Sequence, residues 1–242
     1  MQNAKMYCLS IYDSTFPVIK KLNYIPVGLG NDKFSNQWLR DNTLENISSK
    51  NKYYGEYTFH YWFWKNILPK IENNYWIGFC AYRLYWGNKK KITENSRIED
   101  LVLTEIPKEW EKYDTIVGEH FYINNLKFSK LIKHGLWSLA RNPYALFSSK
   151  RNIRFHFDMW HGNGNLDKAI DLLEDEDKED FRKYTKKNIS YSRGNMFVCR
   201  SKKIMDSYYK SIFSWLDRCE KVFGFNLEGY GKTRIYGFLA ER

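Results

Sequence analysis

The sequence predicts an α/β fold in which a mostly parallel central sheet is flanked by helices. Short apolar runs that suit buried strands alternate with longer segments of helical periodicity, the order typical of a parallel sheet. With 242 residues, 43% of them hydrophobic, the chain is long enough to bury a sizeable core. No repeat or interdomain linker is recognisable, so a single domain over residues 1–242 is expected.

Four apolar runs account for the expected strands: residues 5–12, 75–83, 113–118 and 195–199. The second run, YWIGFCAYR, is apolar at nearly every position, as a strand buried on both faces is. Ligands of parallel sheets bind at the carboxyl ends of the strands. The polar residues that follow each run are therefore the first candidates for a site.

Five segments are expected to be helical: residues 52–66, 126–140, 165–186, 201–222 and 233–241. Aromatic residues fall on one face of the first segment, and Asn142-Pro143 ends the second. Ser201 suits the N-cap of the fourth, and Gly224 lies at its end.

Composition narrows the class of protein. The formal net charge of +11 favours anionic partners, but the basic residues are spread along the chain without zinc spacing or a recognition helix. The sequence contains no Walker A loop, dinucleotide-binding glycine motif, kinase signature or Gly-x-Ser-x-Gly nucleophile. It therefore gives no support to the common nucleotide-binding enzymes or to a nucleophile-based hydrolase.

The expected location is the cytoplasm. No apolar run of about 18 residues is present to span a bilayer, and residues 1–5 do not open a signal peptide. The scattered Cys8, Cys80, Cys199 and Cys219 form no Cys-x-x-Cys pair and are expected to be reduced and buried. Any membrane contact is expected to be peripheral at most.

A polar segment from Asp41 to Asn51 runs directly into the aromatic segment 56–66. Asn46, Ser48 and Asn51 offer amides and a hydroxyl near a predicted helix start, where unpaired backbone N–H groups favour anions. This arrangement suits a site for a nucleotide and a sugar. A plain helix cap preceded by a turn explains it equally well.

Two features close to that segment carry reactive side chains. Glu56 and His60 are four residues apart, so they share a helix face; for His60 a half-buried packing role is the more ordinary interpretation. Arg83 follows a predicted strand among aromatic residues, a setting that suits a diphosphate or a carboxylate. A surface ion pair at the edge of the sheet is the alternative for Arg83.

Residues 154–164, expected to form a loop, bring together His156, Asp158, Trp160 and His161. An Asp or a His can remove a proton from a hydroxyl, and a Trp can lie against a sugar face. A structured surface loop without catalytic function is the alternative.

The C-terminal segment places Arg234 and Glu241 seven residues apart, which brings them to one helix face. The arginine suits a leaving phosphate and the glutamate suits its orientation, and an ion-paired helix end is the alternative. The string Asp175-Glu176-Asp177 lies in a charged segment and is interpreted as a solvated helix face. No metal ligand is therefore assigned.

Six motifs in order resemble those of one known family. The chain contains LRDNTLENISSKN, GEYTFHYWFWKN, YWIGFCAYRLYW, FDMWHGNGNLD, NMFV and RIYGFLAER, over roughly residues 25 to 242. They are similar to the motifs of a domain from capsular and O-antigen polysaccharide loci. That domain was long regarded as of unknown function and is grouped with glycosyltransferases of the nucleotide-diphospho-sugar (GT-A) fold. The resemblance implies a GT-A-like fold for this chain.

The chain departs from the family pattern at a few positions. Leu44 stands where Gly is usual, Ala81 where His is usual, Leu84 where a second Arg is usual, and Phe157 where Tyr is usual. Residues 119–153 resemble an insertion that shapes the acceptor side.

The resemblance implies transfer of a hexose from a nucleotide-diphosphate sugar, UDP-linked and galactose- or galactofuranose-like, to a glycan acceptor. The implied partners are the nucleotide sugar and the glycan, with no specific nucleic acid, and the use of Mn or Mg is left open. The implied catalytic residues are Asp158, His161 and Glu241, with Asp158 the first choice as base. The implied donor-binding residues are Asp41, Asn46, Ser48, Asn51, Glu56, Tyr82, Arg83 and Arg234. The implied acceptor-binding residues are His120, Trp160 and Asn163.

Two other functions stay open. The departures at Ala81 and Leu84 suit a catalytically inactive relative that only binds a glycan. The net charge of +11 and the many aromatic residues suit a basic nucleic-acid-binding protein, whose affinity would fall steeply with salt.

Overall fold

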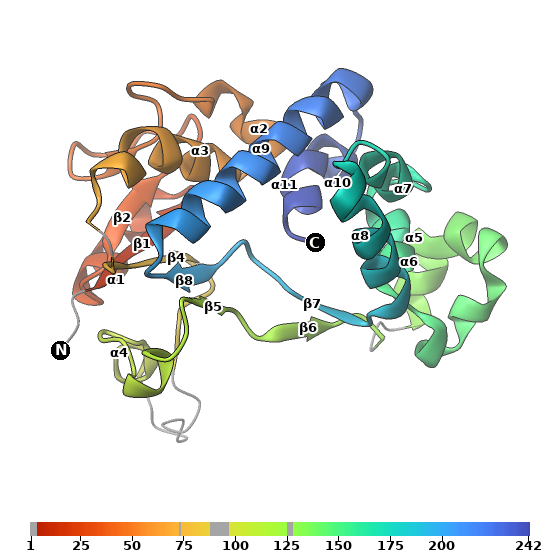
Figure 1. Ribbon diagram of the computed structural model, residues 1–242, viewed down its shortest axis with the longest axis horizontal. Coiled ribbons are helices and arrows are strands. Elements are labelled where there is room, and N and C mark those ends of the chain that lie inside the picture. Colours follow the sequence, from red (N-terminus) through yellow and green to blue (C-terminus); the bar gives the residue numbers. More distant parts are fainter. Residues whose placement is uncertain (1–3, 73, 88–96, 125–127) are drawn as a thin grey trace. The chain divides into compact units, whose positions relative to one another are not determined.

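The computed structural model describes residues 4–72, 74–87, 97–124 and 128–242 (Figure 1). The chain forms two compact units, each made of two stretches of sequence. The first comprises Met1–Gly118 and Gly194–Ser211, and the second comprises Glu119–Arg193 and Ile212–Arg242. Each unit has a sheet and buried clusters of its own. The single domain expected over residues 1–242 stays a prediction.

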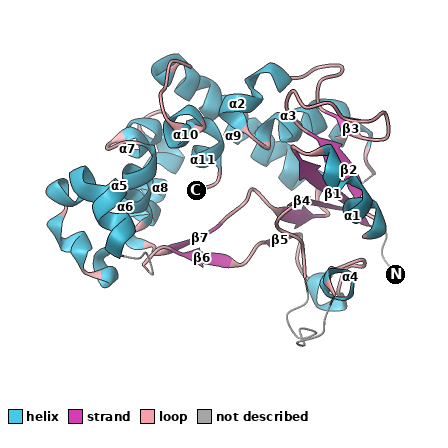
Figure 2. Ribbon diagram, turned by 180° about the vertical axis from the view of Figure 1, so that it is seen from behind, coloured by secondary structure: helices cyan, strands magenta, loops and turns pink. Residues whose placement is uncertain are grey.

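A six-stranded sheet in the order β3-β2-β1-β4-β8-β5 organises the first unit (Figure 2). Its strands are β1 Ala4–Ser10, β2 Ile25–Gly28, β3 Leu39–Arg40, β4 Trp76–Ala81, β5 Thr115–Val117 and β8 Phe197–Cys199. The first four are parallel to one another, whereas β8 is antiparallel to both β4 and β5. The predicted α/β fold with a mostly parallel sheet flanked by helices is confirmed, and all four predicted strands are present.

Both faces of the sheet are buried at its central strands β1 and β4. The unit's helices are α1 Phe16–Lys21, α2 Asn51–Tyr54, α3 Tyr57–Asn66, α4 Ile98–Leu101 and the first part of α9 Lys202–Phe223. On one face the ring of Tyr7 lies 5.4 Å from Phe63 of α3. On the other face Met6 and Cys8 pack in a cluster with Ile19 of α1. Because successive residues of a strand point to opposite faces, this two-sided burial explains the unbroken apolar run of β1.

The helix expected over residues 52–66 is divided in two. Gly55 has a φ of 56° and separates α2 from α3. A left-handed backbone cannot continue a right-handed helix, and glycine adopts it at little cost. The N–H of Gly55 donates to the carbonyl of Asn51 at 2.8 Å, which completes the last turn of α2.

The second unit is mainly helical. It contains α5 Phe128–Arg141, α6 Ile153–His161, α7 Asn165–Ile170, α8 Asp175–Lys187, α10 Tyr230–Thr233, α11 Ile235–Ala240 and the last part of α9. Strands β6 His120–Tyr122 and β7 Ser190–Ser192 pair antiparallel. Helix α6 contacts α5, α7, α8 and α10, so it lies at the centre of this unit. The predicted insertion, residues 119–153, includes β6 and α5, and its residues 125–127 lie outside the described residues.

The prediction of a loop over residues 154–164 is wrong, because most of this segment belongs to helix α6. The side chain of Asn152 accepts a hydrogen bond from the backbone N–H of Phe155 at 2.9 Å and caps the start of this helix. Gly162, with a φ of 100°, follows its end. Only the turn from Gly162 to Gly164 remains of the expected loop.

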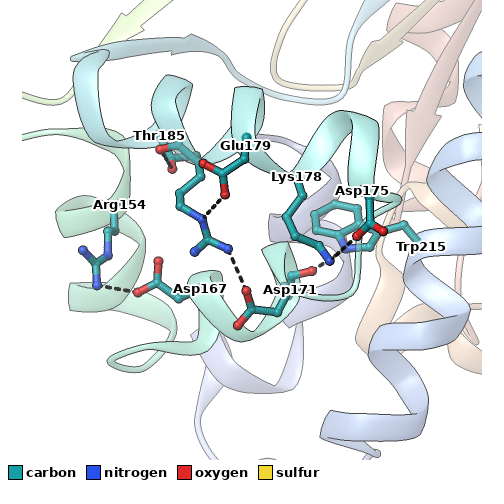
Figure 3. A network of polar contacts seen from close by, with 10 residues as sticks. Arg154, Asp167, Asp171, Asp175, Lys178, Glu179, Thr185 and Trp215 are labelled. Carbon is teal, nitrogen blue, oxygen red and sulfur yellow. Dashed lines mark hydrogen bonds and ion pairs between the residues drawn. The ribbon is translucent and has the colours of Figure 1, made fainter.

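The charged helix expected over residues 165–186 is also two helices, α7 and α8. The guanidinium of Arg182 in α8 reaches back to Asp171, 2.7 Å away, and to Glu179, 3.4 Å away. Lys178 pairs with Asp175 at 2.9 Å, and the Trp215 indole donates to the carbonyl of Ala169 at 2.7 Å (Figure 3). The acidic string 175–177 thus opens a solvated helix, as expected, and its first carboxylate is paired with a lysine.

Two smaller expectations concern the cysteines and the cap of α9. All four cysteines are free and buried, as predicted. Ser201 caps α9 through a hydrogen bond from the N–H of Ile204, 3.3 Å from its hydroxyl. Within the described part of the chain, no helix is long and apolar enough to cross a membrane.

Candidate functional site

The carboxyl ends of four parallel strands meet at one edge of the sheet in the first unit. Ser10, Gly28 and Arg40, which end β1, β2 and β3, occupy neighbouring register positions, and Ala81 ends β4 beside Leu9. This edge is termed the strand-end edge. The segments that follow β3 and β4 contain most of the predicted donor-binding residues.

Arg40 and Asp41 stand together at the end of β3 in different settings. The Arg40 guanidinium donates to the carbonyl of Gly30 at 2.6 Å and lies 4.4 Å from the centre of the Phe34 ring. Asp41 is fully buried, and neither of its carboxylate oxygens has a hydrogen bond of normal geometry within the described chain. Burial raises the pKa of Asp41, while the nearby Thr58 hydroxyl and the Arg40 charge lower it less strongly. A buried carboxyl with so few partners is costly, and such exceptions are typical of functional sites.

Asn51 joins three segments near Asp41. Its side-chain amide donates to the carbonyl of Gly55 and to the hydroxyl of Thr58, both at 3.0 Å. Its oxygen lies against Gly30, where an added Cβ would be 3.2 Å from that oxygen. The structure therefore gives Asn51 an anchoring role between the segment after β2 and the start of α3.

Asn46 and Ser48 hydrogen-bond to each other. The Asn46 side-chain oxygen accepts from the Ser48 hydroxyl at 2.8 Å and from its backbone N–H at 3.2 Å. This is the local turn that Asn side chains commonly form. Leu44, two residues earlier, has a φ of 51° and a relative exposure of 72%. The left-handed backbone explains why glycine suits this position better than leucine.

The aromatic helix α3 fixes this polar segment through its own polar atoms. The Trp62 indole donates to the carbonyl of Thr43 at 2.8 Å. The Asn66 amide donates to the carbonyl of Glu45 at 2.8 Å, and the Tyr61 hydroxyl donates to the Glu45 carboxylate at 2.9 Å. Part of the juxtaposition of polar and aromatic segments is therefore structural.

Tyr82 and Arg83 follow the end of β4 and lie near Tyr12, which follows β1. The backbone N–H of Tyr82 donates to the carbonyl of Leu9 at 2.9 Å, and its ring meets that of Tyr12 edge to face, with centres 5.4 Å apart. The exposed Arg83 guanidinium lies 4.9 Å from the centre of the Tyr82 ring. Partial burial raises the pKa of Tyr82, Arg83 lowers it, and Tyr12 and Glu56 raise it slightly. The structure thus brings Tyr12, Tyr82 and Arg83 together, and the charge of Glu56 is close enough to act on Tyr82.

Tyr12 is a candidate that the sequence analysis missed. It is half exposed, next to Tyr82, in the segment that directly follows β1. Its position as the last residue of the first predicted strand, residues 5–12, was the available signal.

His60 belongs to the core of the first unit. Its Nδ1 atom lies 3.0 Å from the hydroxyl of Tyr209, and its ring packs 4.6 Å from that of Phe79. Burial lowers the pKa of His60 to about 3, so the ring is neutral. His60 therefore packs the core, as its more ordinary interpretation expected, but it is fully buried and not half-buried.

In the second unit, Asp158 lies partly buried in α6, beside the Gly162–Gly164 turn. One carboxylate oxygen accepts the backbone N–H of Gly164 at 3.1 Å, across the Gly162–Gly164 turn. Burial raises the pKa of Asp158 to about 6, against the lowering by the Gly164 N–H and by Arg154; Asp167 raises it further. A carboxylate that titrates near neutral pH can accept a proton efficiently at that pH.

His161 lies three residues further along α6 in a separate environment. It is buried, its Nδ1 atom lies 2.9 Å from the carbonyl of Gly231, and its ring stacks on Phe238 at 4.2 Å. Burial lowers its pKa to about 3, and the Arg242 charge adds to this. A neutral ring beside a carbonyl must carry its proton on Nδ1, which leaves Nε2 as the acceptor nitrogen.

Glu241 forms an ion pair with Arg242, with 3.0 Å between Oε2 and Nη1. The Arg242 side chain is almost fully buried, and its guanidinium lies 4.0 Å from the centre of the Tyr191 ring. Arg234 precedes α11 and donates to the Tyr230 hydroxyl at 3.3 Å. The C-terminal motif therefore has a structural role, because Arg242 packs against Tyr191 of β7.

The three predicted acceptor-binding residues are dispersed within the second unit. His120 is exposed on β6, with Nδ1 3.2 Å from the Ser190 hydroxyl. Trp160 lies against the ring of His134, 4.5 Å away between centres. Asn163 accepts a hydrogen bond from the Ser138 hydroxyl at 2.9 Å, in the same turn that holds Asp158. Asn163 and Asp158 are thus close in the fold, while His120 belongs to a different element.

No metal site is evident in the described ranges. Within them, no three His, Cys, Asp or Glu side chains are arranged so that they could hold an ion.

Comparisons with known proteins give two matches. A family model described as a domain of unknown function, DUF4422, matches residues 7–242. The solved apo structure of WbbM, described as a bifunctional glycosyltransferase, is similar with a TM-score of 0.62 and 20% sequence identity. The similarity covers 99% of this chain and 41% of that one, so this chain spans about two fifths of WbbM. At this identity the similarity shows the fold. No curated protein matches the chain.

Proposed function

The chain belongs to the DUF4422 family, and from this premise we propose that it is a glycosyltransferase. In this proposal a hexose moves from a nucleotide-diphosphate sugar to a glycan acceptor. The observation that carries the proposal is the strand-end edge, where Tyr12, Asp41, Tyr82 and Arg83 gather at the carboxyl ends of parallel strands. Nucleotides bind at such edges in α/β folds. The similarity of the fold to that of a bifunctional glycosyltransferase supports the same reaction class.

The strand-end edge offers chemistry suited to the donor. The exposed Arg83 presents a planar cation on an aromatic ring, a good match for a diphosphate. The edge of Tyr82 and the ring of Tyr12 suit a nucleobase or a sugar face. We assign the donor as UDP-linked and galactose- or galactofuranose-like, with Glu56 as an acceptor for its hydroxyl groups. The donor-binding role of Asp41, which is fully buried, rests on the family resemblance.

The second unit offers chemistry suited to the acceptor. By the family resemblance, a carboxylate base, which we assign as Asp158, takes the proton from an acceptor hydroxyl, whose oxygen forms a bond to the anomeric carbon. The bond from that carbon to the diphosphate breaks, and its electron pair leaves on the phosphate. Glu241 is the second candidate for the base, and its carboxylate is held in an ion pair with Arg242. His161, Trp160 and Asn163 are assigned to the acceptor.

A few parts of the proposal rest on the family resemblance. These are the capsular or O-antigen polysaccharide as product, a cytoplasmic location, and roles for His120, Arg234, Asn46, Ser48 and Asn51. Participation of Mn²⁺ or Mg²⁺ is left open. Arginine side chains can stabilise a leaving diphosphate without a metal ion.

The experiment is thermal unfolding with a panel of nucleotides and nucleotide sugars, with and without Mn²⁺. A ligand at about one hundred times its Kd stabilises the folded state by about 2.7 kcal/mol, which raises the Tm by about 5 to 10 °C for a chain of this size. We expect this rise with UDP or one UDP-sugar and its loss in Arg83→Ala.

Arg200→Ala is the matched control. Arg200 follows β8, near the start of β4, and its guanidinium pairs with Asp114 at 3.3 Å and lies over Trp76. It is therefore an arginine of the same sheet at the opposite edge, and its loss should leave the nucleotide response intact. A panel without any response contradicts the proposal. In that case, a rise with oligonucleotides favours a nucleic-acid-binding protein, and a rise with glycans alone favours an inactive relative.

A further inference from the structure

One part of the second unit differs in charge from the rest of the chain. Between Glu119 and Asp158 the sequence has no aspartate or glutamate, although the chain has 28 acidic residues in all. The same interval contains these basic residues: Lys127, Lys130, Lys133, Arg141, Lys150, Arg151 and Arg154. An anionic surface would therefore meet positive charge and no repelling negative charge from the side chains of this interval.

Helix α5, within this interval, carries both buried and exposed apolar residues. Leu131 and Leu139 are buried and pack in a cluster with Phe155 and Met159 of α6. Phe128, Ile132 and Leu136 are exposed at positions four apart, which places them in one row along the edge of that buried face. Trp137 is 80% exposed and lies one residue, about 100°, further round the helix. Packing within the unit explains the buried residues and leaves the row and Trp137 uncovered.

The segment after α5 adds three more exposed apolar side chains. Tyr144 and Phe147 are 69% and 67% exposed, and Leu146 is also exposed. Ala145 among them is fully buried. The segment therefore has a fixed inner side and a fixed outer side.

A buried arginine holds this segment in shape. The Arg151 guanidinium donates to the carbonyl of Ala145 at 3.0 Å, of Leu146 at 3.1 Å and of Asn124 at 2.9 Å. Three charge-assisted hydrogen bonds to backbone carbonyls hold a defined conformation. The outward display of Tyr144 and Phe147 is consequently built into the fold.

Basic side chains accompany the exposed apolar row. Lys130, Lys133 and Arg141 of α5 are exposed, and so is Lys150 at the end of the following segment. Single exposed apolar residues are ordinary, but a group of this size normally marks an interaction site. Aromatic and aliphatic side chains mixed with lysines and arginines are typical of elements that lie in the interface of an anionic membrane.

We propose that this surface, defined by Phe128, Ile132, Leu136, Trp137, Tyr144 and Phe147 and termed the α5 surface, docks on an anionic phospholipid membrane. The apolar side chains enter the headgroup region, and the nearby lysines meet the lipid phosphates. The lack of acidic residues over the interval is the charge complementarity that selects a membrane over another protein. This binding site is independent of the proposed transfer reaction.

The test is cosedimentation of the full chain with lipid vesicles, one set of phosphatidylcholine and one of phosphatidylcholine mixed with phosphatidylglycerol. Binding is expected only to the mixed vesicles and is expected to weaken as salt rises. Each lysine near an anionic surface contributes about a factor of five, so Lys130→Gln with Lys133→Gln should weaken binding about 30-fold. Trp137→Ser with Phe147→Ser should weaken it about tenfold or more, through the loss of apolar burial.

Two matched controls make the same kinds of substitution outside the α5 surface, one pair removing lysine charge and one pair removing apolar side chains. Lys186→Gln with Lys187→Gln changes two exposed lysines of α8 in the same unit, and Tyr113→Ser with Val222→Ser changes two exposed apolar residues. Both pairs should bind vesicles as the unchanged chain does, and thermal unfolding checks that all variants fold.

Three results would overturn the proposal. These are equal binding to both vesicle types, equal losses in control and α5-surface variants, and a concentration-dependent oligomer that only the α5-surface variants abolish. The last result would assign the surface to a second copy of the chain. Because no nucleotide sugar is involved, failure here would leave the glycosyltransferase proposal untouched.

Discussion

Replacing Asp158 by asparagine should change how the stability of the fold depends on pH. The pKa of Asp158 is raised from 3.8 to about 6, mainly by burial. Because the folded state holds this proton more tightly than the unfolded state, ionisation destabilises the fold. Its contribution to stability is therefore full below about pH 4, falls as the pH rises from about 4 to 6, and stays low above that.

The magnitude follows from the two pKa values. A difference between 3.8 and about 6 corresponds to about 3 kcal/mol at full effect, since one pKa unit is worth about 1.4 kcal/mol. Asp158 is only partly buried, and water screens part of the effect, so about 1 to 2 kcal/mol is expected. Asparagine can still accept the N–H of Gly164 and carries no charge. The free energy of unfolding of Asp158→Asn, relative to that of the unchanged chain, should therefore rise by about 1 to 2 kcal/mol as the pH increases from about 4 to 7.

Urea unfolding followed by tryptophan fluorescence across this pH range measures the difference. Asp175→Asn is the control, because Lys178 lowers the pKa of the exposed Asp175, which reverses the sign of its pH dependence. A difference between Asp158→Asn and the unchanged chain that stays constant with pH would refute the reasoning. If the proposed transfer reaction holds, the same substitution also removes the rise of kcat through about pH 6.

Two substitutions at backbone-sensitive positions test the fold itself. Gly231→Ala should cost about 3 kcal/mol in chemical denaturation, because its Cβ would lie 2.2 Å from the carbonyl oxygen of Trp160, a backbone atom that cannot move aside. Gly224→Ala should cost only about 1 kcal/mol, since its surroundings are open and only the φ of 61° resists it; equal losses would contradict this account. Leu44→Gly should stabilise the fold by about 0.5 to 1 kcal/mol in urea unfolding, as glycine relieves the φ of 51° at some entropic cost. A lower urea midpoint for that variant would show that Leu44 makes contacts that outweigh the strain.

The strands of the first unit were predictable because burial on both faces leaves a plain mark on the sequence. In β1 and β4 nearly every residue is apolar, and the structure shows helices or loops against both sides. The two-residue strand β3 leaves no such mark, since Leu39 and Arg40 carry no periodicity. The antiparallel place of β8 depends on long-range pairing with β4 and β5, which three residues cannot specify.

Helix α6 shows how a site hypothesis can mislead a structural one. The polar residues from His156 to His161 suggested a catalytic loop. In the structure they belong to helix α6, which Asn152 caps at its start and Gly162 follows at its end. These two caps were visible in the sequence. They were overlooked because His156 and His161 were interpreted as catalytic residues of a loop, whereas both are buried together with the apolar residues of α6.

Part of the donor-side candidate set was predictable for the same reason that the sheet was. Tyr82 and Arg83 follow a strand that the sequence indicates clearly, and in the structure the charge of Glu56 acts on Tyr82. The separation of Asp158 from His161 was not predictable, because it depends on α10 and α11, whose contacts with α6 lie far along the chain.

The chain passes between its two units at residues 118–119, 193–194 and 211–212. Neither unit is therefore encoded by an uninterrupted stretch of gene. A single recombination crossover cannot exchange one unit whole and leave the other intact, as it can for domains joined end to end. Related chains should consequently inherit both units together and diverge by substitutions and insertions within each unit.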